Sequence, residues 1–210
     1  MDKLQLLIFP FNGNGLEALD CIDSARFEFI GFVDDNEEKR NQLQPWPIMD
    51  RTALTRHNKA KILAVPGGPL SYLKRSEYIL GLGIDPSRLV SIIHPHAHIG
   101  HSVKIGTNCL IMAGVVLTSN ASIGDHVCIL PNTVVHHDSV IGDHSLVGSN
   151  VAIAGGTRIG RNCYIGSGTN IMNGIEVGEF SLIGLGSNVT KSIAPYSKVA
   201  GNPAKPILKK

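Results

Sequence analysis

Hydrophobic residues recur at every sixth position through the second half of the chain. The run makes 17 consecutive hexads, from residue 93 to residue 194, without an insertion. The hexad positions are Ile93, Ile99, Ile105, Ile111, Leu117, Ile123, Ile129, Val135, Ile141, Val147, Ile153, Ile159, Ile165, Ile171, Val177, Ile183 and Val189. A period of six fits neither an α-helix nor simple strand alternation. It predicts short strands separated by corners, with the aliphatic side chains pointing into one narrow core.

Small residues occupy much of the remaining hexad. Glycine often follows the aliphatic residue directly, and a small or β-branched residue stands four places after it. We expect the glycines to relieve backbone strain near the corners. Three hexads, roughly 18 residues, would close one triangular coil, and the coils would stack as a β-solenoid. The narrow core explains why only Tyr164 and Phe180 are aromatic between 93 and 194.

Residues 1–90 follow a different pattern, in which strand and helix signals alternate. Strands are expected at 4–10, 27–35 and 61–66, helices at 16–25, 51–57 and 70–83, and a glycine turn at 11–15. The alternation predicts a small, Rossmann-like parallel α/β sheet. The predicted domains are therefore an α/β domain, residues 1–90, and a β-helical domain with a C-terminal tail, residues 91–210.

The predicted sheet carries signals for a nucleotide. A glycine turn after the first strand and acids after the second lie where doubly wound sheets bind phosphates and a ribose or base. The candidate substrate-binding residues are Asn12, Gly13, Asn14, Gly15, Asp34, Asp35 and Gly67. The full GxGxxG signature is missing, so a merely tight connection is the alternative, and the absence of a GKS or GKT sequence argues against an ATP-hydrolysing P-loop.

Composition narrows the function classes. With 43% hydrophobic and 17% charged residues, the chain is typical of a globular protein that is neither disordered nor membrane-bound. A net charge of +2 gives no electrostatic case for nucleic acid as the main partner. The first residues favour a strand over a signal peptide. The four cysteines form no CxxC pair, which favours a reduced, cytoplasmic protein.

Candidate chemistry is concentrated in one stretch. Eight of the nine histidines lie between His94 and His144, and the sequence VVHHDSVIG places His136, His137 and Asp138 among apolar hexads. An imidazole suits proton removal near neutral pH, and a neighbouring carboxylate can hold its tautomer. The alternative is that these side chains are ordinary polar corner residues.

Six features together resemble a known family, and the first is the glycine turn FNGNG (11–15). The other five are the hexads, FVDD (32–35), IHPHAHIG (93–100), HHDSVIGDHSLVG (136–148) and the tail AGNPAKPI (200–207). Over nearly its whole length the chain resembles the bacterial hexapeptide-repeat acetyltransferases that acetylate nucleotide-linked amino sugars or sialic acid. Members commonly show Gly-x-Ser-Gly-His-Gly in the first turn, where this chain has PFNGNG (10–15).

The resemblance implies a left-handed parallel β-helix, a homotrimer, and acetyl-CoA bound in the groove between neighbouring helices. It implies that His137 is the base, Asp138 its orienting partner and Gly155, one coil later, the oxyanion donor. The cofactor-binding residues it implies are Gly155, Gly174, Lys191 and Lys205. The implied acceptor is the amino group of a UDP-linked, or otherwise nucleotide-linked, amino-deoxy sugar used in surface-glycan synthesis.

Other functions remain open from the sequence. The acceptor could be a hydroxyl of sialic acid or another sugar, and the chain could be a non-catalytic protein that binds sugar nucleotides. Carbonic anhydrases of the same architecture hold zinc through three histidines. His101 and His137 match two of those positions, but the third falls on Gly142, so no metal is expected.

Overall fold

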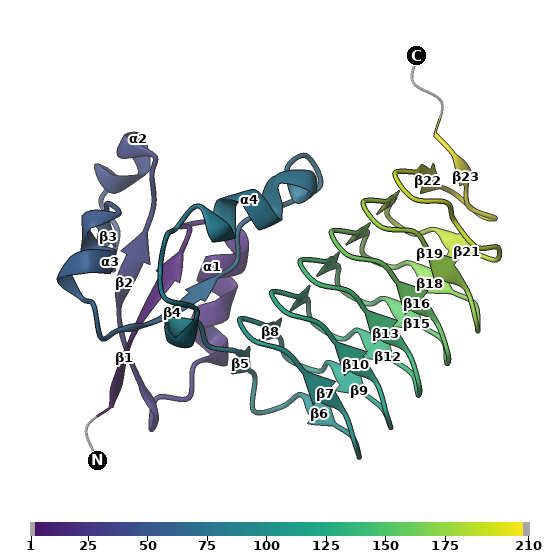
Figure 1. The fold of residues 1–210 in the computed structure, drawn as a ribbon, viewed down its shortest axis with the longest axis horizontal. Helices are drawn as coiled ribbons and strands as arrows, with labels where there is room; N and C mark the ends of the chain where they lie inside the picture. The colour runs from purple at the N-terminus through teal and green to yellow at the C-terminus, as the bar shows by residue number, and fades with distance from the viewer. Residues whose placement is uncertain (1–2, 208–210) are drawn as a thin grey trace.

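The protein, described here from a computed structural model over residues 3–207, has an α/β part at one end and a β-helix extending from it (Figure 1). The α/β part contains a parallel sheet with strand order β3-β2-β1-β4. Its strands are β1 (Leu4–Phe9), β2 (Phe27–Val33), β3 (Ile48–Met49) and β4 (Lys61–Ala64). The three predicted strands are confirmed, and β3 is an additional edge strand.

Short helices connect these strands. They are α1 (Gly13–Glu17), the 3-10 turn η1 (Ala18–Cys21), α2 (Glu37–Arg40), α3 (Thr52–Arg56), η2 (Tyr72–Lys74), α4 (Arg75–Leu80) and η3 (Pro86–Arg88). The predicted boundary between a glycine turn at 11–15 and a helix at 16–25 is wrong. The Asn12 side chain accepts from the Gly15 amide at 2.8 Å and caps α1, so the glycines form the first helical turn.

The hexads form a β-helix whose strands are two residues long until the last coil. One sheet contains β6 (His98–Ile99), β9 (Val116–Leu117), β12 (Val134–Val135), β15 (Ala152–Ile153), β18 (Asn170–Ile171) and β21 (Asn188–Val189). A second contains β7 (Lys104–Ile105), β10 (Ser122–Ile123), β13 (Val140–Ile141), β16 (Arg158–Ile159) and β19 (Glu176–Val177).

The third sheet, which we call the junction face, faces the α/β part. It contains β5 (Ile92–Ile93), β8 (Leu110–Ile111), β11 (Cys128–Ile129), β14 (Leu146–Val147), β17 (Tyr164–Ile165), β20 (Leu182–Ile183), β22 (Lys198–Ala200) and β23 (Lys205–Pro206). All pairings within the β-helix are parallel except that of β22 with β23. No helix occurs between residues 99 and 188, which confirms the predicted solenoid.

The hexad side chains from Ile111 to Val189 form one buried core. Ile93 and Ile99 differ, since each is 38% exposed. They belong to the first coil, which has no preceding coil to cover it. Polar members of the core are also satisfied: the Thr133 hydroxyl donates to the Gly148 carbonyl at 2.7 Å, and the Ser139 hydroxyl to the Ala154 carbonyl at 3.0 Å.

Corner glycines such as Gly156, with a φ of +68°, do relieve backbone strain as predicted, but the glycines that directly follow the aliphatic hexad residues serve a different purpose. A Cβ added to Gly142 would lie 2.6 Å from the Arg161 nitrogen, so this glycine permits the next coil to approach. Backbone with positive φ occurs instead two residues later, as at His144 and, in the other coils, Asn108 and Asn162. Asparagine, aspartate and histidine tolerate this left-handed conformation better than most side chains.

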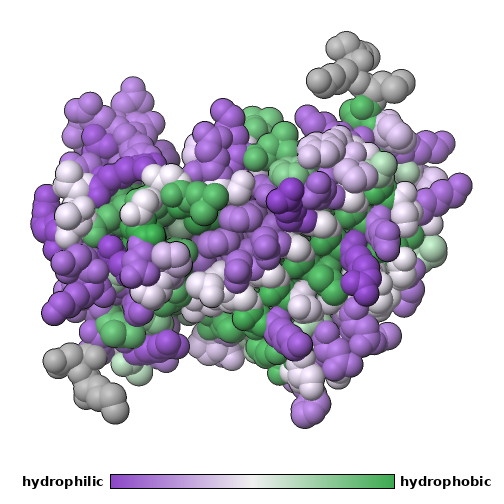
Figure 2. Space-filling view, viewed as in Figure 1, coloured by the Kyte–Doolittle hydropathy of each residue, from purple (hydrophilic) through white to green (hydrophobic). Residues whose placement is uncertain are grey.

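The α/β part packs on the outer side of the junction face. Leu110, Cys128 and Leu146 from that face belong to the same buried cluster as Leu6 and Phe32 from the α/β sheet. On the face turned toward the viewer, Figure 2 shows hydrophobic side chains over both the α/β part and the β-helix, interrupted by polar residues. Among residues 3–207, no helix combines the length and apolarity that a membrane span requires.

Candidate active site

His137 and Asp138 lie on the corner between the six-stranded and five-stranded sheets. We call this corner the histidine edge, residues 100–103, 118–121, 136–139, 154–157, 172–175 and 190–193. The His137 Nδ1 atom is 2.8 Å from Asp138 Oδ2, and the Asn120 side chain donates to Asp138 Oδ1 at 3.0 Å. These two hydrogen bonds lower the pKa of Asp138. The carboxylate therefore orients the imidazole with Nδ1 protonated and Nε2 free.

Gly155 lies one coil after His137 and directly beneath its ring. A Cβ at Gly155 would be 2.5 Å from His137 Nε2, so only glycine leaves room for the imidazole. The neighbouring Gly156 amide donates to the His137 carbonyl at 2.9 Å, which fixes the register of the two coils. Among the described residues, the Gly155 amide donates to no acceptor. The His137 ring and a glycine with an unengaged N–H thus lie against each other on adjacent coils.

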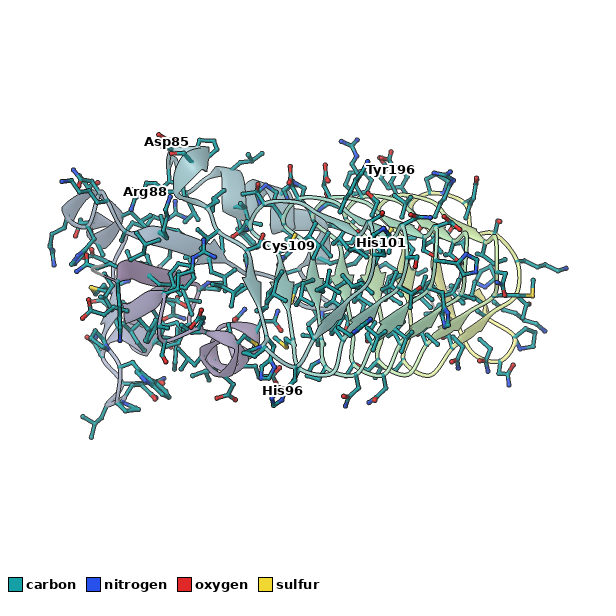
Figure 3. The ribbon with its side chains drawn as sticks, turned by 90° about the horizontal axis from the view of Figure 1, so that it is seen from below. Asp85, Arg88, His96, His101, Cys109 and Tyr196 are labelled. Atoms are coloured by element: carbon teal, nitrogen blue, oxygen red, sulfur yellow. The ribbon has the colours of Figure 1, made fainter. Side chains whose placement is uncertain are left out.

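The predicted cofactor residues divide into two groups. Gly155 and Lys191 occupy the same coil position on the histidine edge as His137 and as His101, which Figure 3 labels at the beginning of this edge. Gly174 lies on the same edge, and its amide donates to the Gly155 carbonyl at 3.1 Å. Lys205 is in β23 on the junction face, so a single chain does not bring it to the others.

The predicted acids lie at the carboxyl ends of the parallel strands. Asp34, Asp35 and Gly67 line a pocket of about 320 Å³ with Phe9, Pro10, Asn36, Lys39, Pro66 and Tyr78. The buried Asp34 carboxylate accepts from the Phe11 amide, the Asn36 amide and Lys39 Nζ, each at 2.9 or 3.0 Å. Asp35 is half-exposed and forms a two-point ion pair with Arg51, at 2.6 and 2.8 Å.

The predicted glycine-turn residues are not equivalent. Asn12 holds the turn itself, since its amide also donates to the Val65 carbonyl at 3.3 Å. A Cβ at Gly15 would be 2.6 Å from the Pro10 carbonyl oxygen, whereas Gly13 has open space beside it. Asn14 and Gly67 line a smaller cavity, about 110 Å³, between the α/β part and the junction face.

Sequence reasoning missed Asn120, Lys39 and Tyr78. Asn120 is found only by adding the coil length backwards from Asp138, since the two positions differ by 18 residues. Lys39 belongs to α2, which was not predicted. Tyr78 lies on the predicted third helix, but its place at the pocket depends on how that helix packs.

The structure brings no metal-ligand group together. Within residues 3–207, no three histidine, cysteine, aspartate or glutamate side chains lie close enough to share an ion. His101 and His137 share the histidine edge two coils apart, and Gly142 has no side chain to contribute.

Comparison with known proteins identifies the repeat and the architecture. The family described as bacterial transferase hexapeptide (six repeats) matches residues 90–119 and 120–155, and hexapeptide repeat of succinyl-transferase matches 140–172 and 156–191. No curated protein sequence matches the chain.

Solved structures match both parts together. The acetyltransferase domain of PglB from Neisseria gonorrhoeae is 25% identical with a TM-score of 0.82, covering 98% of this chain and 100% of that one. PerB from Caulobacter crescentus, solved with CoA and GDP-perosamine, is 23% identical with a TM-score of 0.84, covering 99% of each chain. WeeI from Acinetobacter baumannii is 21% identical with a TM-score of 0.81, covering 98% and 100%.

These matches confirm the left-handed β-helix with its N-terminal α/β domain. The chain therefore carries bacterial transferase hexapeptide repeats, and in its repeats and two-part architecture it resembles the bacterial hexapeptide-repeat acetyltransferases.

Proposed function

We propose that the protein is an acetyl-CoA-dependent N-acetyltransferase that acts on the amino group of a nucleotide-linked amino-deoxy sugar. The observation that carries this proposal is the arrangement of His137, Asp138 and Gly155, in which an oriented imidazole lies against a glycine whose backbone N–H has no acceptor among the described residues. Similarity to the PglB acetyltransferase domain and to PerB supports the acyl donor and the class of acceptor. The resemblance favours UDP as the nucleotide.

The proposed reaction uses the two ends of this arrangement. The acceptor amine attacks the thioester carbonyl carbon while His137 Nε2 removes a proton from the nitrogen. The Gly155 N–H donates to the developing oxyanion. When the C–S bond breaks, the sulfur leaves as coenzyme A and takes up a proton, and the sugar carries the new amide. Asp138 stabilises the imidazolium that forms between these steps.

The nucleotide is proposed to bind in the pocket at the strand ends of the α/β part. Asp35 and the Tyr78 ring are exposed groups there, and Asp34 holds the pocket wall through its three hydrogen bonds. In this proposal residues 1–90 hold the acceptor and residues 91–210 hold acetyl-CoA. Gly174 and Lys191 would extend the cofactor site along the histidine edge.

Within a single chain, the proposed nucleotide pocket and the histidine edge lie apart. The α/β part packs on the junction face, which lies across the triangular prism from the histidine edge. We therefore propose that the enzyme is a homotrimer, in which the histidine edge of one chain meets the α/β part of its neighbour. This arrangement would also bring Lys205 of one chain toward the cofactor site of another.

The function can be tested with a panel of acceptors. Purified protein is incubated with acetyl-CoA and UDP-, GDP- or dTDP-linked 4-amino sugars, or with free sialic acid, and thiol release is measured. We expect release with one amino sugar nucleotide and an amide product by mass spectrometry. Release with sialic acid alone would favour O-acetylation, and binding without release would favour a sugar-nucleotide-binding protein.

A further inference from the structure

Arg75 is a buried cation that has no carboxylate partner within residues 3–207. Its side chain is 0% exposed, and among the described residues it forms no salt bridge. The guanidinium instead donates to two backbone carbonyls: Nη1 to Pro66, and Nη2 to His126 at 2.8 Å. Burial lowers the pKa of Arg75 to about 10, so the group stays charged at neutral pH. Removing a charge from water without a counterion costs free energy. The burial of the Arg75 guanidinium therefore needs a structural or functional explanation.

The two carbonyls belong to different parts of the molecule. His126 lies on a corner of the β-helix beside the junction face, whereas Pro66 follows β4 in the α/β part. Pro66 and Gly67 both line the pocket that contains Asp34 and Asp35, and Gly67 also lines the cavity against the junction face. Arg75 therefore joins the wall of the proposed nucleotide pocket to the β-helix.

A second contact between the β-helix and the end of β4 is made by Asn108, in the first coil. The Asn108 side chain accepts from the Ala64 amide at 2.7 Å and donates to the Ala64 carbonyl at 2.8 Å. Asn108 thus fixes the end of β4, and Arg75 fixes the chain two residues later. Gly67 has a φ of +113°, and a Cβ there would be 3.1 Å from Leu146 Cδ1. The pocket wall is closely fitted between α4 and the β-helix.

An apolar side chain could fill the same space without burying a charge, but it could not donate to both carbonyls. Arginine has five N–H donors in a planar group, and lysine has a single ammonium that cannot span the two acceptors in this way. We propose that Arg75 is a positioning residue that fixes the Pro66–Gly67 wall of the nucleotide-sugar pocket relative to the β-helix. The inference rests on the proposed function, since it assigns the nucleotide to that pocket.

Two variants of Arg75 test this inference. Arg75→Met retains most of the volume and loses every donor, and Arg75→Lys retains the charge. Lys74→Ala removes a neighbouring exposed cation and serves as the matched control. The measurements are KM for the nucleotide sugar, KM for acetyl-CoA, and the dissociation constants of UDP and of coenzyme A by titration calorimetry.

We expect Arg75→Met to raise the KM for the nucleotide sugar and the UDP dissociation constant at least tenfold, with coenzyme A affinity within twofold of wild type. Arg75→Lys should be intermediate, and Lys74→Ala should match wild type. Equal loss of affinity for both substrates would show general destabilisation and overturn the inference, as would unchanged UDP affinity in a folded Arg75→Met protein.

Hydrogen exchange provides a measurement independent of activity. A peptide covering residues 62–69 should exchange faster in Arg75→Met, because Pro66 loses its donor, while β1 should retain its protection. Unchanged exchange in 62–69 would contradict the inference. If wild-type protein neither turns over nor binds UDP or GDP, the proposed function fails. The exchange result then decides separately whether Arg75 fixes this segment.

Discussion

One hydrogen bond determines which nitrogen of His137 is available for chemistry. Asp138 accepts from Nδ1 at 2.8 Å, and its second oxygen is held by Asn120 at 3.0 Å. Nε2 therefore faces the Gly155 position with its lone pair free. His136 has no such partner among the described side chains, although it belongs to the same corner. The two adjacent histidines consequently have different surroundings.

The first prediction separates these histidines. His137→Ala should lower kcat at least about 100-fold, within the usual range for removal of a general base. His136→Ala should change kcat far less, because nothing orients its ring toward Gly155. Steady-state kinetics with a verified acceptor, together with melting temperatures, checks the comparison. A greater loss in His136→Ala than in His137→Ala would mean that the assignment of the base to His137 is wrong.

The second prediction concerns the glycine beneath the imidazole. In Gly155→Ala the new Cβ would be 2.5 Å from His137 Nε2, so the ring must move away from its present position. We expect kcat to fall about 100-fold, since displacements of about 1 Å have effects of this size. The melting temperature should change little, because the His137 side chain is 61% exposed and free to turn into solvent.

Gly156→Ala is the matched control for this experiment. Its Cβ would meet nothing within 4 Å, but its φ is +68°. We expect a loss of about 1 kcal/mol in unfolding free energy from the left-handed conformation, with kcat retained. If both variants lose activity in proportion to stability, the steric account of Gly155 is incorrect.

At the residue scale, the sequence predicts some site features better than others. Resemblance to known acetyltransferases pairs the His137 imidazole with the Asp138 carboxylate, and the coil length of 18 residues predicts that Gly155 lies one coil away from His137. Neither approach could identify Arg75, because its burial depends on α4 packing against the junction face rather than on its neighbours in the chain. The sequence predicts that Asp34 binds substrate, yet its carboxylate accepts three hydrogen bonds from the first loop and from the α2 region of the same chain.

At the scale of elements, periodicity predicted the β-helix well because each coil repeats the same environment. The α/β part was predicted less accurately. Glycine and asparagine have low helix propensity, so 11–15 read as a turn, whereas the Asn12 cap and packing make Gly13–Glu17 helical. The edge strand β3 has only two residues, too few for a recognisable alternation.

The third prediction concerns two histidines at left-handed corners of the β-helix, His126 and His144. His126 and His144 stack with ring centroids 4.5 Å apart, and the His144 Nδ1 atom is buried without a hydrogen-bond partner. Burial, His126 and Arg75 lower the pKa of His144 from 6.5 to about 4, and their effect exceeds that of Asp125 and Asp143. Burial also lowers the pKa of His126.

The pH dependence follows from this difference. Between pH 6.5 and about 4 the unfolded chain binds more protons at His144 than the folded chain does. This contribution to stability is therefore complete above pH 6.5 and is lost as the pH falls toward 4. His144→Asn should make the melting temperature less dependent on pH in this window, because it removes the titrating imidazole. Asparagine suits this corner, since it occupies the equivalent corners at Asn108 and Asn162.

Thermal melts at pH 7 and pH 5 check this prediction, with His96→Asn as the control at an exposed histidine. The control should retain the wild-type difference between the two pH values. An equal pH dependence in wild type and His144→Asn would mean that the stacked pair does not control acid stability.

At the scale of the whole molecule, the separation of the two candidate sites gives the fourth prediction. His137 is on the histidine edge, and the pocket containing Asp35 is across the prism in the α/β part. If each active site combines the edge of one chain with the pocket of its neighbour, two inactive variants should complement each other in mixed trimers. His137→Ala lacks the proposed base, and Asp35→Lys changes the pocket and places a second cation beside Arg51, the ion-pair partner of Asp35.

Co-expression of the two variants under different affinity tags, followed by tandem purification, gives the mixed trimers. In each mixed trimer, which contains the two variants in a 2:1 or 1:2 ratio, about one in three shared sites combines an intact edge with an intact pocket, so about a third of wild-type activity should return. Each variant assembled alone should remain inactive, which controls for leakage. Mixed trimers that show no recovery would mean that each chain builds its own site, and monomeric protein at micromolar concentration would exclude the shared arrangement altogether.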